Sequence, residues 1–211
     1  MKNGPWVKQD ATGTRRDKRR QAMLDAAGSV FSEKGYEAAT LSEVVARSGG
    51  SLSTLYELFG NKAGLLAAMV SERCERISSV IEGATLSGKE PAAALREIAR
   101  YLLDQLIDTD GIALLRIVIA EAGRQPELGQ RFYEAGPASG RRTMGRYLAS
   151  QVKRGALDID DPEAAGVYFF HMLLGDLQMR MLCGVPVASD LDAEAHVSRT
   201  VDAFVRLYAP R

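Results

Sequence analysis

The stretch SLSTLYELFGNKAGLL, residues 51–66, has two different faces within one short helical segment. At 100° per residue, the side chains of Leu52, Leu58 and Phe59 fall within about 60° of Leu55 and form an apolar stripe with it. Ser53 and Glu57 lie opposite, and Thr54 and Tyr56 flank that outer face. A helix that presents small hydroxyls can lie deep in the major groove of DNA, because nothing bulky holds it away. A solvated face on a small helix explains this pattern equally well. The residues on either side of this segment are needed to distinguish the two interpretations.

The preceding residues predict two more helices. Leu24, Ala27 and Phe31 recur at three- and four-residue steps over about residues 15–34, and Gly35 ends that helix. A second, short helix follows and stops before the helix at 51–60. Two short helices joined by a tight turn and packed on a first helix form a helix-turn-helix unit.

The capping signals and the later periodicity agree with this reading. Thr40 and Glu43 have the spacing of a capping box, and Gly49 follows the helix that they begin. Further helices are expected at 61–83, 91–108, 111–123, 126–154 (interrupted at Pro137), 162–182 and 190–208. The predicted fold class is therefore all-α.

The composition is that of an ordinary soluble protein. The 211 residues are 46% hydrophobic and 26% charged, and the longest apolar run, 164–175, is too short to span a bilayer. The polar N-terminus does not resemble a secretory signal. Cys74 and Cys183 are far apart in the sequence, which favours reduced structural thiols in a cytoplasmic protein over a disulfide framework or a metal site. No cofactor and no membrane partner is expected.

The zero net charge hides an asymmetry between the two ends of the chain. Residues 1–62 carry ten Lys and Arg against seven Asp and Glu, a charge of +3, and the remainder carries −3. The segment TRRDKRR, residues 14–20, concentrates five cations around Asp17. It indicates either a local contact with a polyanion or a basic tail that only adds solubility.

The run from Phe31 to Leu66 resembles the DNA-binding domain of the TetR family of transcriptional regulators. The shared motifs are F-x-x-K-G-Y, T-L-x-x-V-A, S-G, S-x-x-T-L-Y-x-x-F and N-K-x-x-L. The match is strong over about residues 15–70. The later segments LLRIVIAEA and RFYEAGP are similar to a subgroup that includes repressors of efflux pumps.

The resemblance implies a set of operator contacts, which are Thr40, Ser51, Leu52, Ser53, Thr54, Tyr56 and Lys62. Three positions depart from the family pattern. Gly50 replaces a usual aliphatic residue, so a looser turn is expected. Leu52 replaces a frequent lysine, and either packs inward or touches a thymine methyl. Glu57 places an anion on the outer face, where it reads a cytosine amino group or lies outside the groove.

The resemblance also implies a division of the chain into a disordered N-terminal arm (1–14), a DNA-binding domain (15–62) and a helical regulatory and dimerisation domain (63–211). The function implied is that of a homodimeric repressor, released from a palindromic operator by a small-molecule ligand. An efflux or stress operon is the suggested target. An activator role stays open.

Candidate ligand contacts in the regulatory domain are Tyr101, Arg116, Phe170 and His171. Arg116 stands alone in an apolar segment, so it pairs with a structural carboxylate, contacts an anionic or polar ligand, or is exposed. His171 suits a core or interface position as well as a ligand contact. Its helix, 162–182, is apolar nearly all round, as a helix buried on two sides would be.

The last two helices of the family pair across a two-fold axis as a four-helix bundle. The candidate dimer residues are Phe169, Met172, Leu173, Val201 and Phe204.

Two functions of other classes compete with DNA binding. The first is an all-helical enzyme or cofactor carrier, and the second is a helical interaction module that does not bind DNA. The sequence offers no glycine-rich phosphate loop, no metal-ligand spacing and no nucleophile beside a base. An enzyme is therefore not expected.

Overall fold

The computed structural model describes residues 14–107, 109–187 and 191–210. Every regular element in these ranges is a helix, which confirms the all-α prediction. The expected disordered arm, residues 1–14, lies outside the described residues except for Thr14.

The described residues divide into two compact units. The first contains the chain up to Glu72 together with Arg116–Phe132, and the second contains Arg73–Leu115 and the residues from Tyr133 onward. Helices α4 (Lys62–Leu86) and α6 (Thr109–Ala122) each contribute to both units. This division differs from a boundary at residue 62, because the end of α6 and most of α7 (Pro126–Tyr133) belong with the N-terminal helices.

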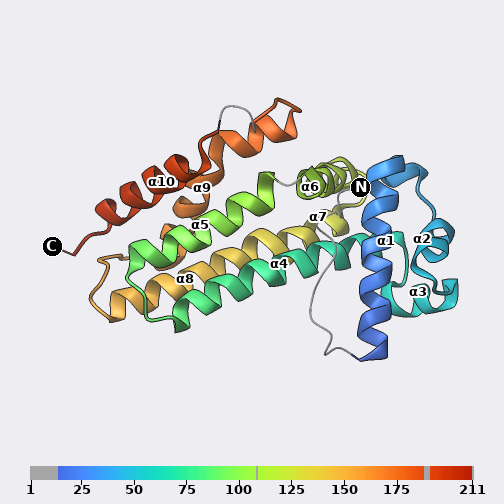
Figure 1. Ribbon diagram of the computed structural model, residues 1–211, viewed down its shortest axis with the longest axis horizontal. Coiled ribbons are helices and arrows are strands. Elements are labelled where there is room, and N and C mark those ends of the chain that lie inside the picture. The colour runs from blue at the N-terminus through green and yellow to red at the C-terminus, as the bar shows by residue number, and fades with distance from the viewer. Residues whose placement is uncertain (1–13, 108, 188–190, 211) are drawn as a thin grey trace. The chain divides into compact units, whose positions relative to one another are not determined.

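The first unit begins with α1 (Arg15–Ala38), on which α2 (Leu41–Ser48) packs, and α3 (Leu52–Phe59) packs on α2 in turn (Figure 1). The Thr14 hydroxyl caps α1 by accepting a hydrogen bond from the Asp17 amide at 3.2 Å. Gly35, at φ 76°, interrupts the helix where the sequence predicted its end. The helix-turn-helix prediction is thereby confirmed in this unit.

The turn between α2 and α3 is filled from α1. Gly49 adopts the left-handed conformation, at φ 69°, and ends α2. A Cβ atom on Gly50 would lie 2.4 Å from the terminal methyl of Met23, which is fully buried. Met23 therefore occupies the space that an aliphatic side chain at position 50 would need.

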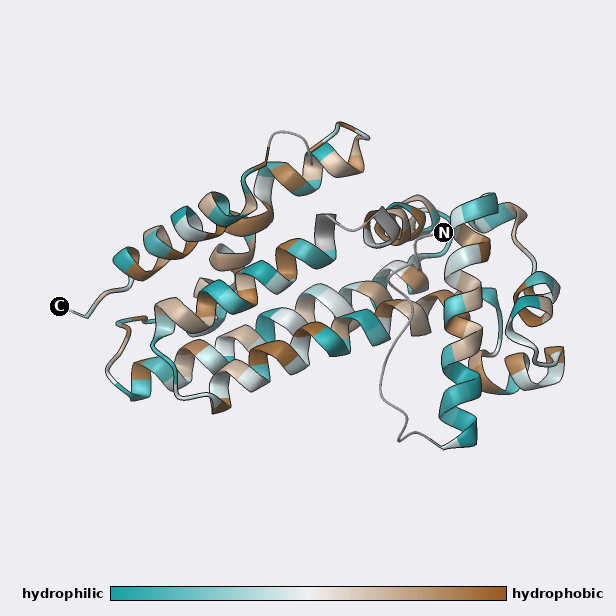
Figure 2. Ribbon diagram, in the orientation of Figure 1, coloured by the Kyte–Doolittle hydropathy of each residue, from teal (hydrophilic) through white to brown (hydrophobic). Residues whose placement is uncertain are grey.

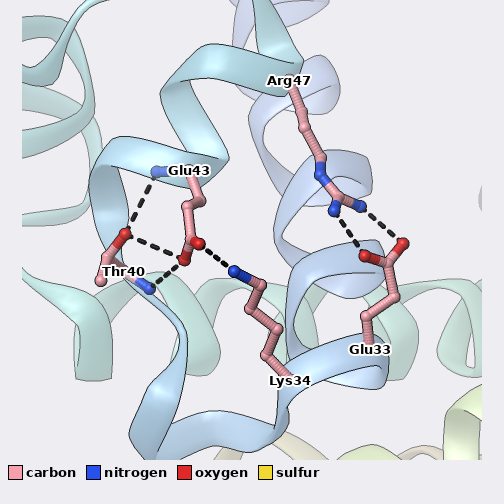
Figure 3. Close-up of polar contacts among 5 residues, drawn as sticks. All are labelled: Glu33, Lys34, Thr40, Glu43 and Arg47. Carbon is pink, nitrogen blue, oxygen red and sulfur yellow. Dashed lines mark hydrogen bonds and ion pairs between the residues drawn. The ribbon is translucent and has the colours of Figure 1, made fainter.

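Two ion pairs join α1 to α2 (Figure 3). Arg47 forms a fork with both carboxylate oxygens of Glu33, one of them at 2.7 Å. Lys34 pairs with Glu43, and the same carboxylate accepts from the backbone amide and the hydroxyl of Thr40, both at 3.0 Å. We call these five residues the α1–α2 clamp.

The second unit contains five further elements, which are α5 (Pro91–Ile107), a π-helix (Glu134–Ala138), α8 (Ser139–Lys153), α9 (Pro162–Leu182) and α10 (Ala193–Leu207). It also contains the end of α4 and the beginning of α6. The Asp161 carboxylate caps α9, accepting from the amides of residues 163 and 164. Helices α8 and α9 cross closely at two glycines. A Cβ atom on Gly145 or on Gly166 would lie 3.1 Å from the opposite helix.

Helix α9 turns a different side inward than the sequence suggested. Phe169, Leu173, Val201 and Phe204 are each fully buried within the single chain. The rings of Phe169 and Phe204 pack edge to face, with centroids 5.1 Å apart. Four of the five proposed dimer residues are therefore wrong, because their side chains already form this core; Met172 alone, 38% exposed, is accessible.

The α1–α2 clamp generates a prediction about pH. The bonds from Lys34 and Thr40 hold the pKa of Glu43 down, from an ordinary 4.5 to about 2. A carboxylate with a lowered pKa stabilises the fold above its unfolded pKa, and loses that contribution as the pH falls toward the folded value. The difference in unfolding free energy between wild type and Glu43→Gln should be present above about pH 4.5 and should disappear near pH 2.

Urea unfolding followed by circular dichroism between pH 2 and 7 measures this difference. Glu90→Gln is the control, because Glu90 is exposed and lies outside the clamp. A difference for Glu43→Gln that stays constant over this range would contradict the account.

Candidate nucleic-acid interface

The rotation of α3 about its axis is fixed by two buried side chains. Leu55 is fully buried and Phe59 is 9% exposed, so both face the core of the first unit. The side chains on the other side of the helix are accessible. Leu52 is 39% exposed, Tyr56 is 52% exposed, and Ser53 is exposed as well. The structure therefore agrees with the two faces read from the sequence except at Leu52, which the periodicity placed on the apolar side and which is exposed.

The hydroxyls at the start of α3 form a small network. Ser51 caps the helix by accepting from the Thr54 amide at 3.2 Å. The same Ser51 oxygen lies 2.9 Å from the hydroxyl of Ser53 and 2.9 Å from that of Thr54. These three predicted contact residues are thus brought together at the helix N-terminus, where free amides favour a phosphate.

Thr40 and Lys62, also predicted DNA contacts, form bonds within the protein. The Thr40 hydroxyl belongs to the capping box of α2. The Lys62 ammonium donates to the carbonyl of Glu37 at 3.0 Å and lies over the ring of Tyr36, 4.5 Å from its centroid. Burial lowers the pKa of Lys62. A phosphate contact by Lys62 would require its ammonium to leave this position.

The start of α1 supplies the basic residues of the same unit. Its first turns are strongly hydrophilic (Figure 2), and Arg15, Arg16 and Arg19 are exposed. Arg16 pairs with Glu57 of α3 at 3.4 Å, and both side chains are largely exposed. Because Glu57 already has this cation as a partner, its carboxylate does not add an uncompensated negative charge to the outer face of α3.

A polar cluster that sequence reasoning missed joins the end of α6 and the residues after it to the end of α1. Glu121 is only 6% exposed, and its carboxylate accepts from the Gln125 side chain at 3.1 Å. Gln125 also hydrogen-bonds with Tyr36, whose pKa is raised by burial and then by the charge of Glu121. Arg124 pairs with Glu37 and lies 3.7 Å from Glu121. We call these five residues the α6–α1 junction.

The sequence signal for this junction was weak. Glu121 follows an apolar segment as a lone carboxylate, but nothing local indicated which residues would surround it. Its Coulombic influence reaches Lys62 as well as Tyr36. Glu121 of α6 therefore interacts electrostatically with Tyr36 of α1 and with Lys62, the first residue of α4.

The four predicted ligand residues are not gathered in one unit. Tyr101 and Phe170 are half-buried and His171 is exposed, all in the second unit. Arg116 is exposed and belongs to the first unit.

The second unit contains another candidate ligand contact that the sequence did not suggest. Tyr147 is fully buried, and its hydroxyl has no hydrogen-bond partner among the described residues. Burial raises the pKa of Tyr147 to about 12, so this phenol stays protonated.

Among the residues that the structure describes, no cluster of His, Cys, Asp and Glu side chains is suited to hold a metal ion. In the same ranges, no helix has the length and apolar character that crossing a membrane requires.

Comparisons with known proteins agree with the geometry. Residues 23–69 match the family model "Bacterial regulatory proteins, tetR family". Residues 93–210 match "AefR-like transcriptional repressor, C-terminal domain", which covers more than half of the chain.

Relatives and solved structures give the same result. The transcriptional activator FasR of Mycolicibacterium smegmatis is 31% identical over 47% of this chain and 46% of its own length, so the chain spans less than half of that relative. A TetR-family regulator from Mesorhizobium loti is 27% identical, with a TM-score of 0.83 over 93% of this chain and 100% of that one. The flavonoid-responsive regulator FrrA is 26% identical, with a TM-score of 0.69 over 92% and 99% of the two chains. The chain therefore belongs to the TetR family of bacterial transcriptional regulators.

Proposed function

We propose that this protein regulates transcription from the cytoplasm by binding a palindromic DNA operator as a homodimer, and that a small-molecule ligand releases it. The observation that carries the proposal is the outward face of α3. Ser53 and Tyr56 are exposed there, while Leu55 and Phe59 anchor the helix from below. Hydroxyl groups suit both phosphate oxygens and base edges in the major groove.

The charge of the first unit supports the same reading. Arg15, Arg16 and Arg19 lie at the start of α1, and Arg16 reaches α3 through its pair with Glu57. Cations at this place would contact the DNA backbone and add affinity without adding sequence preference.

The family excludes the enzyme alternative, since its members are transcriptional regulators. The match of residues 93–210 to a repressor domain favours repression. FasR shows that a relative of this chain is named an activator. An efflux or stress operon remains the suggested target, on the sequence resemblance alone.

The DNA proposal is tested by removing two hydroxyls from α3. Thr54→Ala with Tyr56→Phe should weaken specific binding by about 1–3 kcal/mol for each good contact that is lost. Binding sequences are first selected from a random DNA pool, and affinity is then measured by fluorescence anisotropy. Ser79→Ala with Tyr133→Phe, at two exposed positions of the second unit outside the proposed interface, is the matched control. Equal affinities for wild type and the α3 variant would refute the assignment.

The homodimer proposal now rests on the outer side of α9. Tyr168 and Met172 are 55% and 38% exposed and lie one helical turn apart; Met179, 61% exposed, lies beyond Gly175, where the backbone of α9 is not helical. Such a row of large apolar side chains is typical of a protein interface. In a two-fold dimer each copy would present the same row to its partner. Two recognition helices about 34–36 Å apart would then read successive turns of the major groove.

Variants of adjacent residues separate this interface from the core. Met172→Arg with Met179→Arg should leave the fold intact and give monomers, because like charges would face each other across the two-fold axis. Leu173→Ala should lower the free energy of unfolding by about 2–5 kcal/mol and remain dimeric, because Leu173 is fully buried. Sedimentation velocity and urea unfolding measure the two effects. A double arginine variant that stays dimeric would place the interface elsewhere.

The ligand proposal is supported by Tyr147 and by the α6–α1 junction. A buried hydroxyl without a partner is unusual, and a polar group on a ligand would satisfy it. The junction ties α6, which has residues in both units, to the helices that carry the DNA contacts. A ligand releases DNA only if it binds better to the conformation that fits the operator less well.

Two variants separate ligand binding from its transmission. A panel of flavonoids and other small phenols is screened for release of the selected operator. For an active compound, Tyr147→Phe should weaken ligand binding. Glu121→Gln should retain ligand binding and reduce the change in operator affinity, which is typically 5- to 150-fold in coupled systems. Calorimetry measures the first quantity and anisotropy the second. If the ligand releases the operator from Glu121→Gln as fully as from wild type, the junction does not transmit the signal.

A further inference from the structure

We propose that Leu52 determines part of the operator sequence by contacting the 5-methyl group of a thymine in the major groove. The inference rests on the proposed DNA-binding function and deepens it, because it assigns a base to one residue. Leu52 is the first residue of α3, directly after the cap at Ser51.

The structure removes the alternative that Leu52 packs inward. The core beneath α3 is filled by Leu55 and Phe59, which are fully buried and 9% exposed, while Leu52 is 39% exposed. An exposed leucine by itself is ordinary. Leu52, however, lies one helical turn before Tyr56, which is 52% exposed. The two side chains form an apolar row along one edge of the exposed side of α3, beside Ser53.

The neighbouring groups hold Leu52 in a defined place. The Ser51 hydroxyl is bonded to the Thr54 amide and lies 2.9 Å from the hydroxyls of both Ser53 and Thr54. This network fixes the backbone on both sides of Leu52. Farther round the helix, the carboxylate of Glu57 is directed to Arg16, at 3.4 Å. Leu52 is thus an exposed apolar side chain at the N-terminal end of α3, the end that would enter the groove.

The chemistry of the groove then selects the base. Thymine alone presents a methyl group in the major groove, beside its O4 acceptor; guanine presents two acceptors, adenine an acceptor and an amino group, and cytosine an amino group. A leucine side chain has no donor or acceptor, so it would leave those polar groups without a partner. Against a thymine it buries the methyl group instead, which is favourable in water. A lysine at this position would favour guanine, through its O6 and N7 atoms.

The test removes single methyl groups from the DNA. An operator is selected from a random pool with the full chain, and each thymine is replaced in turn, in both half-sites, by deoxyuridine. Wild type should lose about three- to five-fold in affinity per half-site at one position, the size expected for one buried methyl group. Leu52→Ala should lose its sensitivity at that position and keep the wild-type response at every other thymine. Leu207→Ala is the control, because Leu207 is exposed and lies on α10.

A second selection uses Leu52→Lys, which should no longer enrich thymine at the same position. If wild type selects a sequence but Leu52→Ala responds to every deoxyuridine as wild type does, the role of Leu52 is refuted and DNA binding stands. If wild type enriches no sequence and binds all duplexes alike, both the inference and the proposed function are refuted. Circular dichroism confirms that each variant is folded.

Discussion

The burial of Leu55 and Phe59 beneath α3 is the constraint on which the proposed interface depends. The helix has eight residues, so two anchors one turn apart determine its rotation. If that rotation changed, Ser53 and Tyr56 would no longer share the exposed face. The core that receives the anchors is built by α1 and α2, and Met23 fills the space beside Gly50. Packing thus sets the direction of every polar group on the outer face.

Polar interactions then fix how the helices of the first unit are held. The α1–α2 clamp is exposed, so each of its ion pairs contributes little on its own. Its value lies in orientation, since Arg47 forms a two-pronged contact with Glu33. The α6–α1 junction differs because Glu121 is buried. A buried carboxylate has few alternative partners. A movement of α6 would therefore change the electrostatic interactions of Glu121 with Tyr36 and with Lys62.

Local patterns in the sequence predicted the fold well. The faces of α3, the capping box at Thr40 and the helix break at Gly35 depend on neighbouring residues, and each is present in the structure. The inward side of α9 was not predictable in this way. Its rows containing Leu173 and Met172 are both apolar, so periodicity does not distinguish core from surface.

Contacts between distant residues were also beyond the sequence. Lys62 carries a motif match, yet its ammonium bonds to the carbonyl of Glu37, 25 residues away in the chain. Glu121 meets Tyr36 across a still longer separation. Such pairs depend on how whole helices pack, and a single sequence contains no local signal for that packing.

The central claim is that the N-terminal end of α3 enters the DNA groove. Hydrogen–deuterium exchange of the full chain, with and without a selected operator duplex, tests it most directly. The account predicts slower exchange of the amides at residues 51–54, which have no partner within the helix other than its cap. Residues 91–107 of α5 should be unaffected. Protection confined to the second unit, with none at residues 51–54, would contradict the account.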